Sequence, residues 1–243
     1  MHRFFIETEG TDSVRALLSK EEAAHALRVL RLKDGEKVEA LDGKGGIWSG
    51  VIRIDGENVF VEIGDTLNDC EADVNVTIYM GIPKGEKLEF IAQKLTELGA
   101  STLVPVRMER CIAKIDDKEQ EKKLSRIRKI AKEAQKQCGR ARELTILPPV
   151  DFKKAVTMIA KHDVTALLWE EADGYRLKDA WQEFSDAEDV AYIVGPEGGI
   201  SQREAEAFIE AGAKCVSLGP RILRAETAAV TGCAVIMSLW GDI

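Results

Sequence analysis

Two glycine-containing turns, and the charged residues beside them, are the part of this sequence best suited to chemistry. The first turn, residues 195–199 (GPEGG), follows the apolar run 192–194, and the second, residues 219–220, follows the strand-like run 215–218. Glycine has no side chain, so its backbone N–H group can approach a ligand closely. Because two strand exits in one α/β unit form a crevice at the carboxyl ends of the strands, we expect a ligand site here.

Arg221, Arg224, Glu197 and Glu226 lie within or just after these turns. A guanidinium presents a planar fork of donors, so the arginines favour recognition of an anion or a base, with surface salt bridging as the alternative. Either carboxylate can take a proton or hold an arginine in place. The GPEGG turn lacks the G-x-G-x-x-G and G-x-x-x-x-G-K-[ST] spacings, which argues against Rossmann and P-loop sites. Taken alone, it is equally compatible with a tight strand-to-helix turn.

Composition describes an ordinary globular chain without a metal centre. The 243 residues are 45% hydrophobic and 31% charged, which suits one or two domains. Five cysteines and three histidines are dispersed, with no C-x-x-C pair, so we expect reduced thiols and no zinc site. No signal peptide or membrane span is evident in the sequence, which favours a cytoplasmic location.

The distribution of charge is uneven along the chain. The net charge is −8, but residues 110–142 contain twelve Lys/Arg and five Asp/Glu, a local net charge of +7. Such a basic block can be the electrostatic footprint of a protein that binds nucleic-acid phosphate. A solvated, charge-laced helix explains the same block, and the block by itself favours that simpler interpretation.

The hydrophobic pattern changes near residues 66–73, which predicts a domain boundary there. Up to residue 70 the pattern predicts a small β-rich domain. We expect strands at 2–6, 37–41, 47–54 and 59–63, and a helix that opens with a capping box at 19–22 and continues to about Leu32.

From residue 74 to 243, continuous apolar runs alternate with helical patterns. Strands of this kind are typical of a mostly parallel sheet covered on both faces, so the second domain is predicted to be α/β. We expect strands at 76–82, 103–106, 144–147, 166–169, 190–194 and 215–218. We expect helices at 88–98, 118–137, 152–160, 177–184 and 201–212, and from about Glu226.

The pair GPEGG…LGPRILRAETAA resembles the signature of SPOUT-type RNA methyltransferases. More narrowly, the chain is similar to the RsmE family of 16S ribosomal RNA uracil-N3 methyltransferases. The resemblance spans nearly the whole chain and includes residues 1–5, His25 with 29–31, 84–89, 94–99, 107–110 and 137–142. The chain departs from the family where Lys136 replaces an acid and where Glu143-Leu144 replaces a Val-Pro pair.

This resemblance implies a PUA-like RNA-binding barrel over residues 1–70 and a SPOUT methyltransferase domain, with a C-terminal trefoil knot, over residues 74–243. It also implies a homodimer that uses S-adenosylmethionine to methylate N3 of one uridine in 16S ribosomal RNA of the small subunit. Methylation of a ribose 2′-oxygen and a non-catalytic RNA-binding factor are the alternatives.

The resemblance also implies roles for individual residues. Arg224 or Arg221 would stabilise the uracil anion, and Glu197 or Glu226 would take its proton. The cofactor would contact Leu168, Gly195, Pro196, Glu197, Gly199, Leu218, Gly219, Ile222, Leu223, Arg224, Thr227 and Ala228. RNA phosphates would contact Arg3, Arg28, Arg31, Arg110, Lys132, Arg140 and Arg142.

Overall fold

The computed structural model describes residues 1–6, 15–56, 58–112, 117–172 and 174–243. It divides the chain into two units. Unit 1 comprises Met1–Glu71 and Gln135–Glu143, and unit 2 comprises Ala72–Ala134 and Leu144–Ile243. Part of the basic segment, residues 113–116, lies outside the described residues. The chain therefore leaves unit 1 after residue 71 and returns to it for nine residues before the second half of unit 2.

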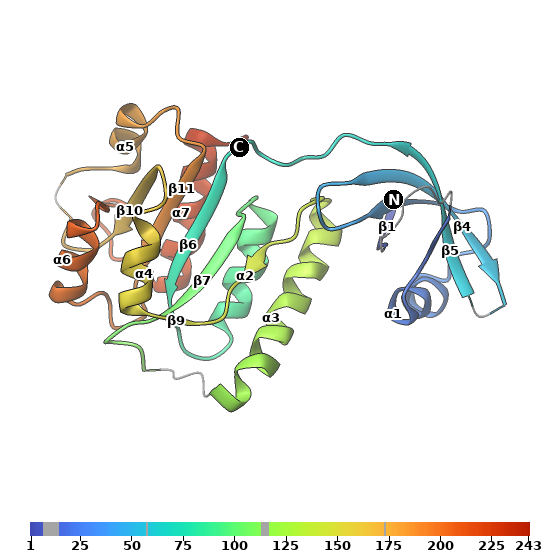
Figure 1. Cartoon of the computed structure of the whole chain (residues 1–243), viewed down its shortest axis with the longest axis horizontal. Helices are drawn as coiled ribbons and strands as arrows, with labels where there is room; N and C mark the ends of the chain where they lie inside the picture. Colours follow the sequence, from blue (N-terminus) through green and yellow to red (C-terminus); the bar gives the residue numbers. More distant parts are fainter. Residues whose placement is uncertain (7–14, 57, 113–116, 173) are drawn as a thin grey trace. The chain divides into compact units, whose positions relative to one another are not determined.

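Unit 1 is built on a five-stranded sheet in the order β1-β3-β4-β5-β2 (Figure 1). β1 and β3 are parallel, and the other neighbours are antiparallel. The strands are β1 (His2–Phe5), β2 (Arg15–Leu17), β3 (Lys37–Leu41), β4 (Ile47–Asp55) and β5 (Asn58–Thr66). Alternate residues such as Val38, Ala40, Val59 and Val61 are buried in the core of the unit, as period-2 patterning predicts. The sequence did not predict β2.

The helix predicted to run from residue 19 to Leu32 is present, but it changes type after Ala24 and ends at Val29. The α-helix α1 covers Lys20–Ala24 and passes into a π-helical turn, η1, over His25–Val29. Arg31 then has a φ of 55°, in the left-handed region that ends helices. The change of helix type leaves Arg28 and Val29 exposed.

The predicted capping box at the start of α1 is also only half formed. Ser19 Oγ accepts a hydrogen bond from the Glu22 N–H at 3.2 Å. The buried Glu22 carboxylate instead pairs with Lys136 Nζ at 2.6 Å. A contact from a residue more than a hundred positions away in the sequence thus takes the acid that local spacing assigned to the cap.

Unit 2 contains a parallel sheet in the order β12-β10-β11-β6-β7-β8, with β9 also paired to β7. The strands are β6 (Asn75–Gly81), β7 (Thr102–Arg107), β8 (Thr145–Ile146), β9 (Val150–Asp151), β10 (Val164–Leu168), β11 (Asp189–Val194) and β12 (Lys214–Val216). The parallel α/β architecture is confirmed. The interiors of its central strands β6, β7, β10 and β11 are buried and mostly apolar because both faces of the sheet are covered.

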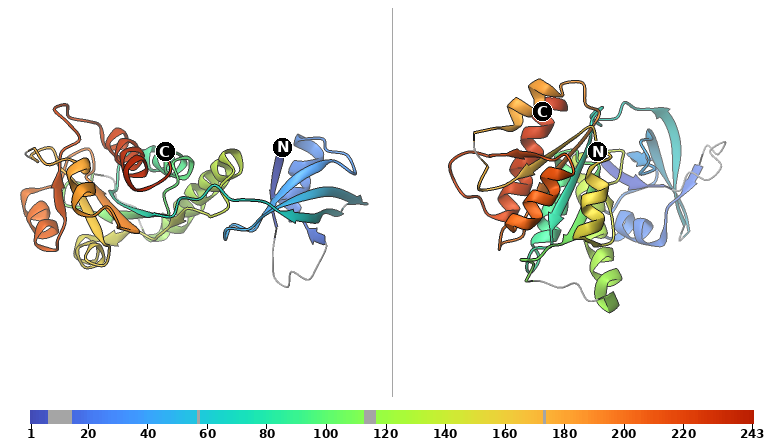
Figure 2. Two further views of the ribbon diagram at one scale, coloured as in Figure 1. Left: turned by 90° about the horizontal axis from the view of Figure 1, so that it is seen from above. Right: turned by 60° about the vertical axis from the view of Figure 1, so that its left-hand side comes forward.

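Helices lie on both sides of the sheet (Figure 2). One face carries α2 (Lys87–Glu97), α3 (Asp117–Cys138), α5 (Leu177–Glu183) and α7 (Ala225–Trp240), and the other carries α4 (Phe152–Ile159) and α6 (Gln202–Glu210). Successive residues of one strand feed opposite cores: Tyr192 packs with α7, and Ile193 packs with α6. Across the described residues, no helix has the length and apolarity needed to cross a membrane.

β10 and β12 end earlier than the sequence predicted, at Leu168 and Val216. The Trp169 N–H still reaches Val216 O, at 3.3 Å, but the Ser217 N–H donates to Tyr175 O at 2.9 Å instead of continuing the ladder. Leu168 pairs in register with both Val194 and Val216. Three strand exits therefore lie side by side at the carboxyl edge of the sheet.

The α4–α6 face offers a test of this core. Phe208 is fully buried and packs edge-to-face on Phe152, with ring centroids 5.0 Å apart. Phe208→Ala should lower the free energy of unfolding by about 3–5 kcal/mol because it leaves a cavity. Its neighbour Ile209, which is 42% exposed, is the control, and Ile209→Ala should cost about 1 kcal/mol or less. If urea titrations gave the same decrease in the free energy of unfolding for both variants, this packing would be contradicted.

Candidate functional site

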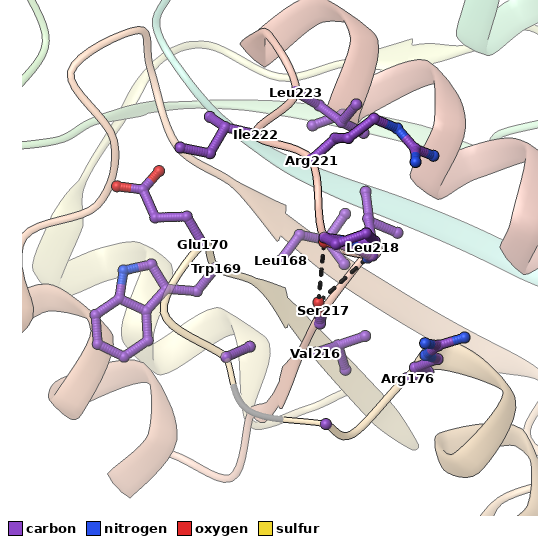
Figure 3. Close-up of a pocket in the computed structure, with 15 residues that line it drawn as sticks. Leu168, Trp169, Glu170, Arg176, Val216, Ser217, Leu218, Arg221, Ile222 and Leu223 are labelled. Carbon is purple, nitrogen blue, oxygen red and sulfur yellow. Dashed lines mark hydrogen bonds between the residues drawn. The ribbon is translucent and has the colours of Figure 1, made fainter.

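A cavity of about 410 Å³ opens at the carboxyl ends of β10 and β12 (Figure 3). Its walls are mostly apolar: Leu168, Val216, Leu218, Ile222, Leu223 and Ala228. Trp169 and Glu170 lie on one side of it, and Arg176 and Arg221 lie on the other (Figure 3). The cavity thus combines an apolar interior with charges of opposite sign on opposite sides.

A second cavity, of about 380 Å³, adjoins the first. The two share Leu168, Ile222, Leu223 and Ala228. The second cavity is also lined by Lys87, Val194, Gly195, Pro196, Glu197, Arg224 and Ala225. It is the more polar end of the site, because it brings a lysine, a glutamate and an arginine together.

The GPEGG turn forms one wall of the second cavity, and its glycines are needed for its shape. The Gly199 N–H donates to Pro196 O at 2.9 Å, and Gly199 has a φ of 72°. A Cβ at Gly195 would lie 2.7 Å from Ile200 Cγ1 and 3.0 Å from the Gly199 carbonyl carbon. The chain therefore folds back on itself here too closely for any side chain at residue 195.

Lys87, in the first turn of α2, bridges two of the predicted catalytic carboxylates. Its Nζ lies 3.0 Å from Glu197 Oε1 and 2.9 Å from Glu226 Oε2. The backbone N–H of Lys84 also donates to Glu197, at 3.1 Å. We call Lys87, Glu197 and Glu226 the charge triad. The sequence identified both acids but assigned no role to the lysine between them.

The charge triad sets the protonation of both carboxylates. Burial alone would raise the pKa of Glu197, but hydrogen bonds from Lys87 and backbone N–H groups lower it below the ordinary 4.5. Burial and the Lys87 hydrogen bond oppose each other at Glu226 in the same way, and its pKa is also lowered. Hydrogen bonds to Glu226 and Glu197 raise the pKa of Lys87. Both acids are ionised at neutral pH, and their lowered pKa values make them weak proton acceptors.

Arg221 and Arg224 are exposed at the mouth of the site. Arg224 stands immediately before α7, and its side chain does not cap that helix. Within the part of the chain that the structure describes, no hydrogen bond or ion pair engages either guanidinium. Arg221 lines the first cavity and Arg224 the second. The two cations are therefore available to a ligand in different parts of the site.

Most of the predicted cofactor residues come together. Gly199 and Thr227 are the two that line neither cavity. The sequence missed Lys87, Trp169, Glu170, Arg176 and Ser217, which line the site. Trp169 and Ser217 were placed inside strands, and the early ends of β10 and β12 release them into the loops. Trp169 and Ser217 each directly follow a strand at the carboxyl edge of the sheet, and this position was the signal that could have identified them.

The predicted RNA-binding arginines have different surroundings in unit 1. Arg3 Nε lies 2.6 Å from Glu39, and its Nη1 donates to the carbonyls of Lys136 and Gln137. Arg140 is only 5% exposed and pairs with Glu71 at 2.8 Å. Phosphate would have to displace Glu71 from a buried pair to reach Arg140, so the structure gives that arginine a structural role.

The other five predicted RNA contacts are not equivalent either. Arg28, Arg31 and Arg142 are exposed on unit 1. On unit 2, Lys132 is half-buried. Arg110 is exposed but directs its guanidinium to the carbonyls of Gly198 and Ile200.

Comparison with known protein families gives two matches along the chain. A model described as an RNA methyltransferase domain matches residues 70–237. A second, described as an RNA methyltransferase PUA domain, matches residues 18–64. Together they cover most of both units.

Curated relatives match over nearly their full length. "Ribosomal RNA small subunit methyltransferase E" of Bacillus subtilis is 32% identical over 240 residues, which is 94% of this chain and 93% of the relative. The protein of the same name from Aquifex aeolicus is 30% identical over 240 residues, covering 98% of this chain and 100% of its own.

Two solved structures share the fold closely. A methyltransferase from Legionella pneumophila, in complex with the cofactor SAM, has a TM-score of 0.89 and 32% identity, covering 100% of this chain and 99% of its own. Ribosomal RNA small subunit methyltransferase E from Neisseria gonorrhoeae, bound to S-adenosyl methionine, has a TM-score of 0.90 and 29% identity with the same coverage.

The charge triad can be tested by its effect on the two acids. Lys87→Met removes the hydrogen bonds that lower the pKa of Glu197 and Glu226 but leaves their burial, so both pKa values should rise above those of the parent. NMR titration of the glutamate carboxyl carbons measures this. Lys84→Met is the control because the Lys84 backbone N–H, which it keeps, is the group that contacts Glu197. Unchanged pKa values in Lys87→Met would contradict the triad.

The sign of the linked stability follows from the same shifts. Lowered carboxyl pKa values stabilise the fold fully above the ordinary value of 4.5, and this contribution is lost as the pH falls through the lowered values. Lys87→Met should therefore flatten the acid-side fall of the free energy of unfolding below about pH 4.5. Urea titrations across that range would show it.

Proposed function

Since the chain belongs to the RNA methyltransferase family, we propose that it transfers the methyl group of S-adenosylmethionine to N3 of one uridine in the 16S RNA of the small ribosomal subunit. Methylation of ribosomal RNA with this cofactor follows from the family and its relatives. The choice of N3 is supported by the arrangement of Arg224 and the charge triad.

The residues at the carboxyl edge fit S-adenosylmethionine. A cavity of about 410 Å³ is within the ordinary range for small-molecule sites. Its apolar walls suit an adenine ring, and the charges of Glu170, Arg176 and Arg221 on opposite sides suit an amino-acid group that carries both signs. When bound, the cofactor supplies a methyl group activated by a positively charged sulfur.

Arg224 carries the proposal for N3 chemistry. Loss of the N3 proton moves negative charge onto the two flanking carbonyl oxygens of uracil. A guanidinium fixed beside the second cavity would stabilise that anion as it forms. Arg224 suits this role because the neighbouring Lys87 is already engaged by two carboxylates. Holding the base in line with the methyl group supplies the rest of the rate.

Glu197 and Glu226 act on the lysine and not on the uracil proton in this scheme. Their lowered pKa values make them weak bases, so the proton leaves to solvent. Their negative charge holds Lys87 and, through Glu226, acts on Arg224, which lies close enough to lower the pKa of that acid. This assignment changes the proton-accepting role that the resemblance implied.

We assign RNA binding to unit 1 and methyl transfer to unit 2. The target base has to be unstacked to reach a cavity, as is general for enzymes that act on a base. We also propose a cytoplasmic homodimer with a knotted C-terminal segment. The hydrogen bond from the Ser217 N–H to Tyr175 O, together with the contacts of α7 with β6 and β11, supports the knot. A crystal structure that traces the C-terminal segment tests the dimer and the knot.

The reaction can be tested by transfer of a radiolabelled methyl group to small-subunit particles and to naked RNA. The modified nucleoside is then identified. The parent should form N3-methyluridine. Arg224→Ala should lower kcat about 10²-fold or more while cofactor affinity stays within about threefold, because the lost charge acts on the transition state. Arg203→Ala, an exposed arginine on α6, should behave as the parent. A 2′-O-methyl product would overturn the N3 assignment.

Variants of two arginines in unit 1 should distinguish a role in RNA binding from a role in the stability of the fold. Arg31→Ala should weaken RNA binding and reduce the salt slope of log K by about one, because Arg31 is exposed. Arg140→Ala should instead lower the free energy of unfolding by about 3–5 kcal/mol, because the buried Glu71 would lose its charged partner and keep only the hydrogen bond from the Arg142 N–H. An Arg140 variant of parental stability with a reduced salt slope would reverse these roles.

A further inference from the structure

Arg110, three residues after the end of β7, holds the GPEGG turn from outside the two cavities. Arg110 Nη1 donates to Gly198 O at 3.2 Å and to Ile200 O at 3.5 Å. Gly198 and Arg110 lie so close together that a Cβ at Gly198 would be 2.9 Å from Arg110 Cβ and 3.0 Å from Arg110 O. One guanidinium thus bonds the carbonyls on both sides of Gly199.

These two carbonyls belong to peptide units that are held at both ends. A peptide unit is planar, so fixing the direction of its C=O also fixes the direction of its N–H. In the first unit, Gly198 O accepts from Arg110 and the Gly199 N–H donates to Pro196 O at 2.9 Å. In the second, Ile200 O accepts from Arg110 and the Ser201 N–H donates to Glu204 Oε2 at 3.1 Å.

Glu109 extends the same connection into α6. Its N–H donates to Glu204 Oε1 at 2.8 Å, and its carboxylate accepts from Ser201 Oγ at 3.0 Å. Ser201 and Glu204 are buried and form the capping box of α6. The Arg110 contact is therefore the outer part of a buried network that begins where the GPEGG turn ends.

We propose that Arg110 is a positioning residue for cofactor binding. Its guanidinium fixes the peptide planes 198–199 and 200–201 and so holds the GPEGG turn in the shape that lines the second cavity. This role differs from the phosphate contact implied by the family resemblance. The inference concerns cofactor binding alone, so its test does not depend on which RNA atom is methylated.

The test compares Arg110→Met with Arg203→Met. Arg203 is an exposed arginine in the first turn of α6, so its variant removes a nearby positive charge and leaves the Gly198 and Ile200 contacts intact. Calorimetry should show S-adenosylmethionine binding about tenfold weaker in Arg110→Met and unchanged in Arg203→Met. Amide hydrogen exchange without cofactor should be faster at Gly199 and Ser201 in Arg110→Met alone.

A second variant distinguishes loss of the Gly198 and Ile200 contacts from loss of the positive charge alone. Arg110→Lys keeps the charge, but an ammonium on a flexible four-carbon stem is less pre-organised than the guanidinium whose Nη1 bonds both carbonyls, so cofactor affinity should fall several-fold. Small-subunit RNA should bind Arg110→Met with the parental salt slope.

Parental cofactor affinity in Arg110→Met would overturn the proposal, and so would unchanged exchange at Gly199 and Ser201. A salt slope smaller by about one would identify a phosphate contact instead and also overturn it. If Arg110→Met does not fold, Arg110→Lys decides, and parental cofactor affinity in that variant overturns the proposal.

Discussion

Leu168 pairs with Val194 on one side and with Val216 on the other, and the site depends on this parallel register. Parallel strands that end together release their loops at one edge, so residues far apart in the sequence line one pair of cavities. The register is held because each strand buries side chains on both faces; a slip of one residue would exchange the α7 core for the α6 core. Fold stability and site geometry therefore rest on the same packing.

At this edge of the sheet, the cations Lys87 and Arg224 have different electrostatic surroundings. Lys87 lies between two carboxylates. It lowers the pKa of both acids, and they raise its own pKa, so all three groups are charged at neutral pH. The positive charge of Lys87 is balanced by two carboxylates and exerts little field on a ligand, whereas the guanidinium of Arg224 is exposed at the same cavity. The two acids are thus best understood as supports for the cations and not as bases.

Much of the fold was predictable from sequence because its signals are local. Apolar runs, glycine turns and the Ser201 capping box predicted α6 and the unit 2 strands other than β9 to within a few residues. What failed depended on distant partners. Lys136 takes the Glu22 carboxylate from the predicted cap, and Tyr175 takes the Ser217 N–H from the strand. Lys87 was missed for the same reason, since its carboxylates lie more than a hundred residues away in the sequence.

The basic segment shows why a count of charges is not a binding surface. Within it, Arg140 is held by Glu71 in a buried pair, whereas Arg126 and Arg128 pair with Glu86 and Glu121 at exposed positions. Exposed pairs contribute little to stability, so RNA phosphate can replace their acids at small cost, but a buried pair resists exchange. The segment is thus partly a charge-laced helix, and only its exposed cations can serve as the electrostatic footprint.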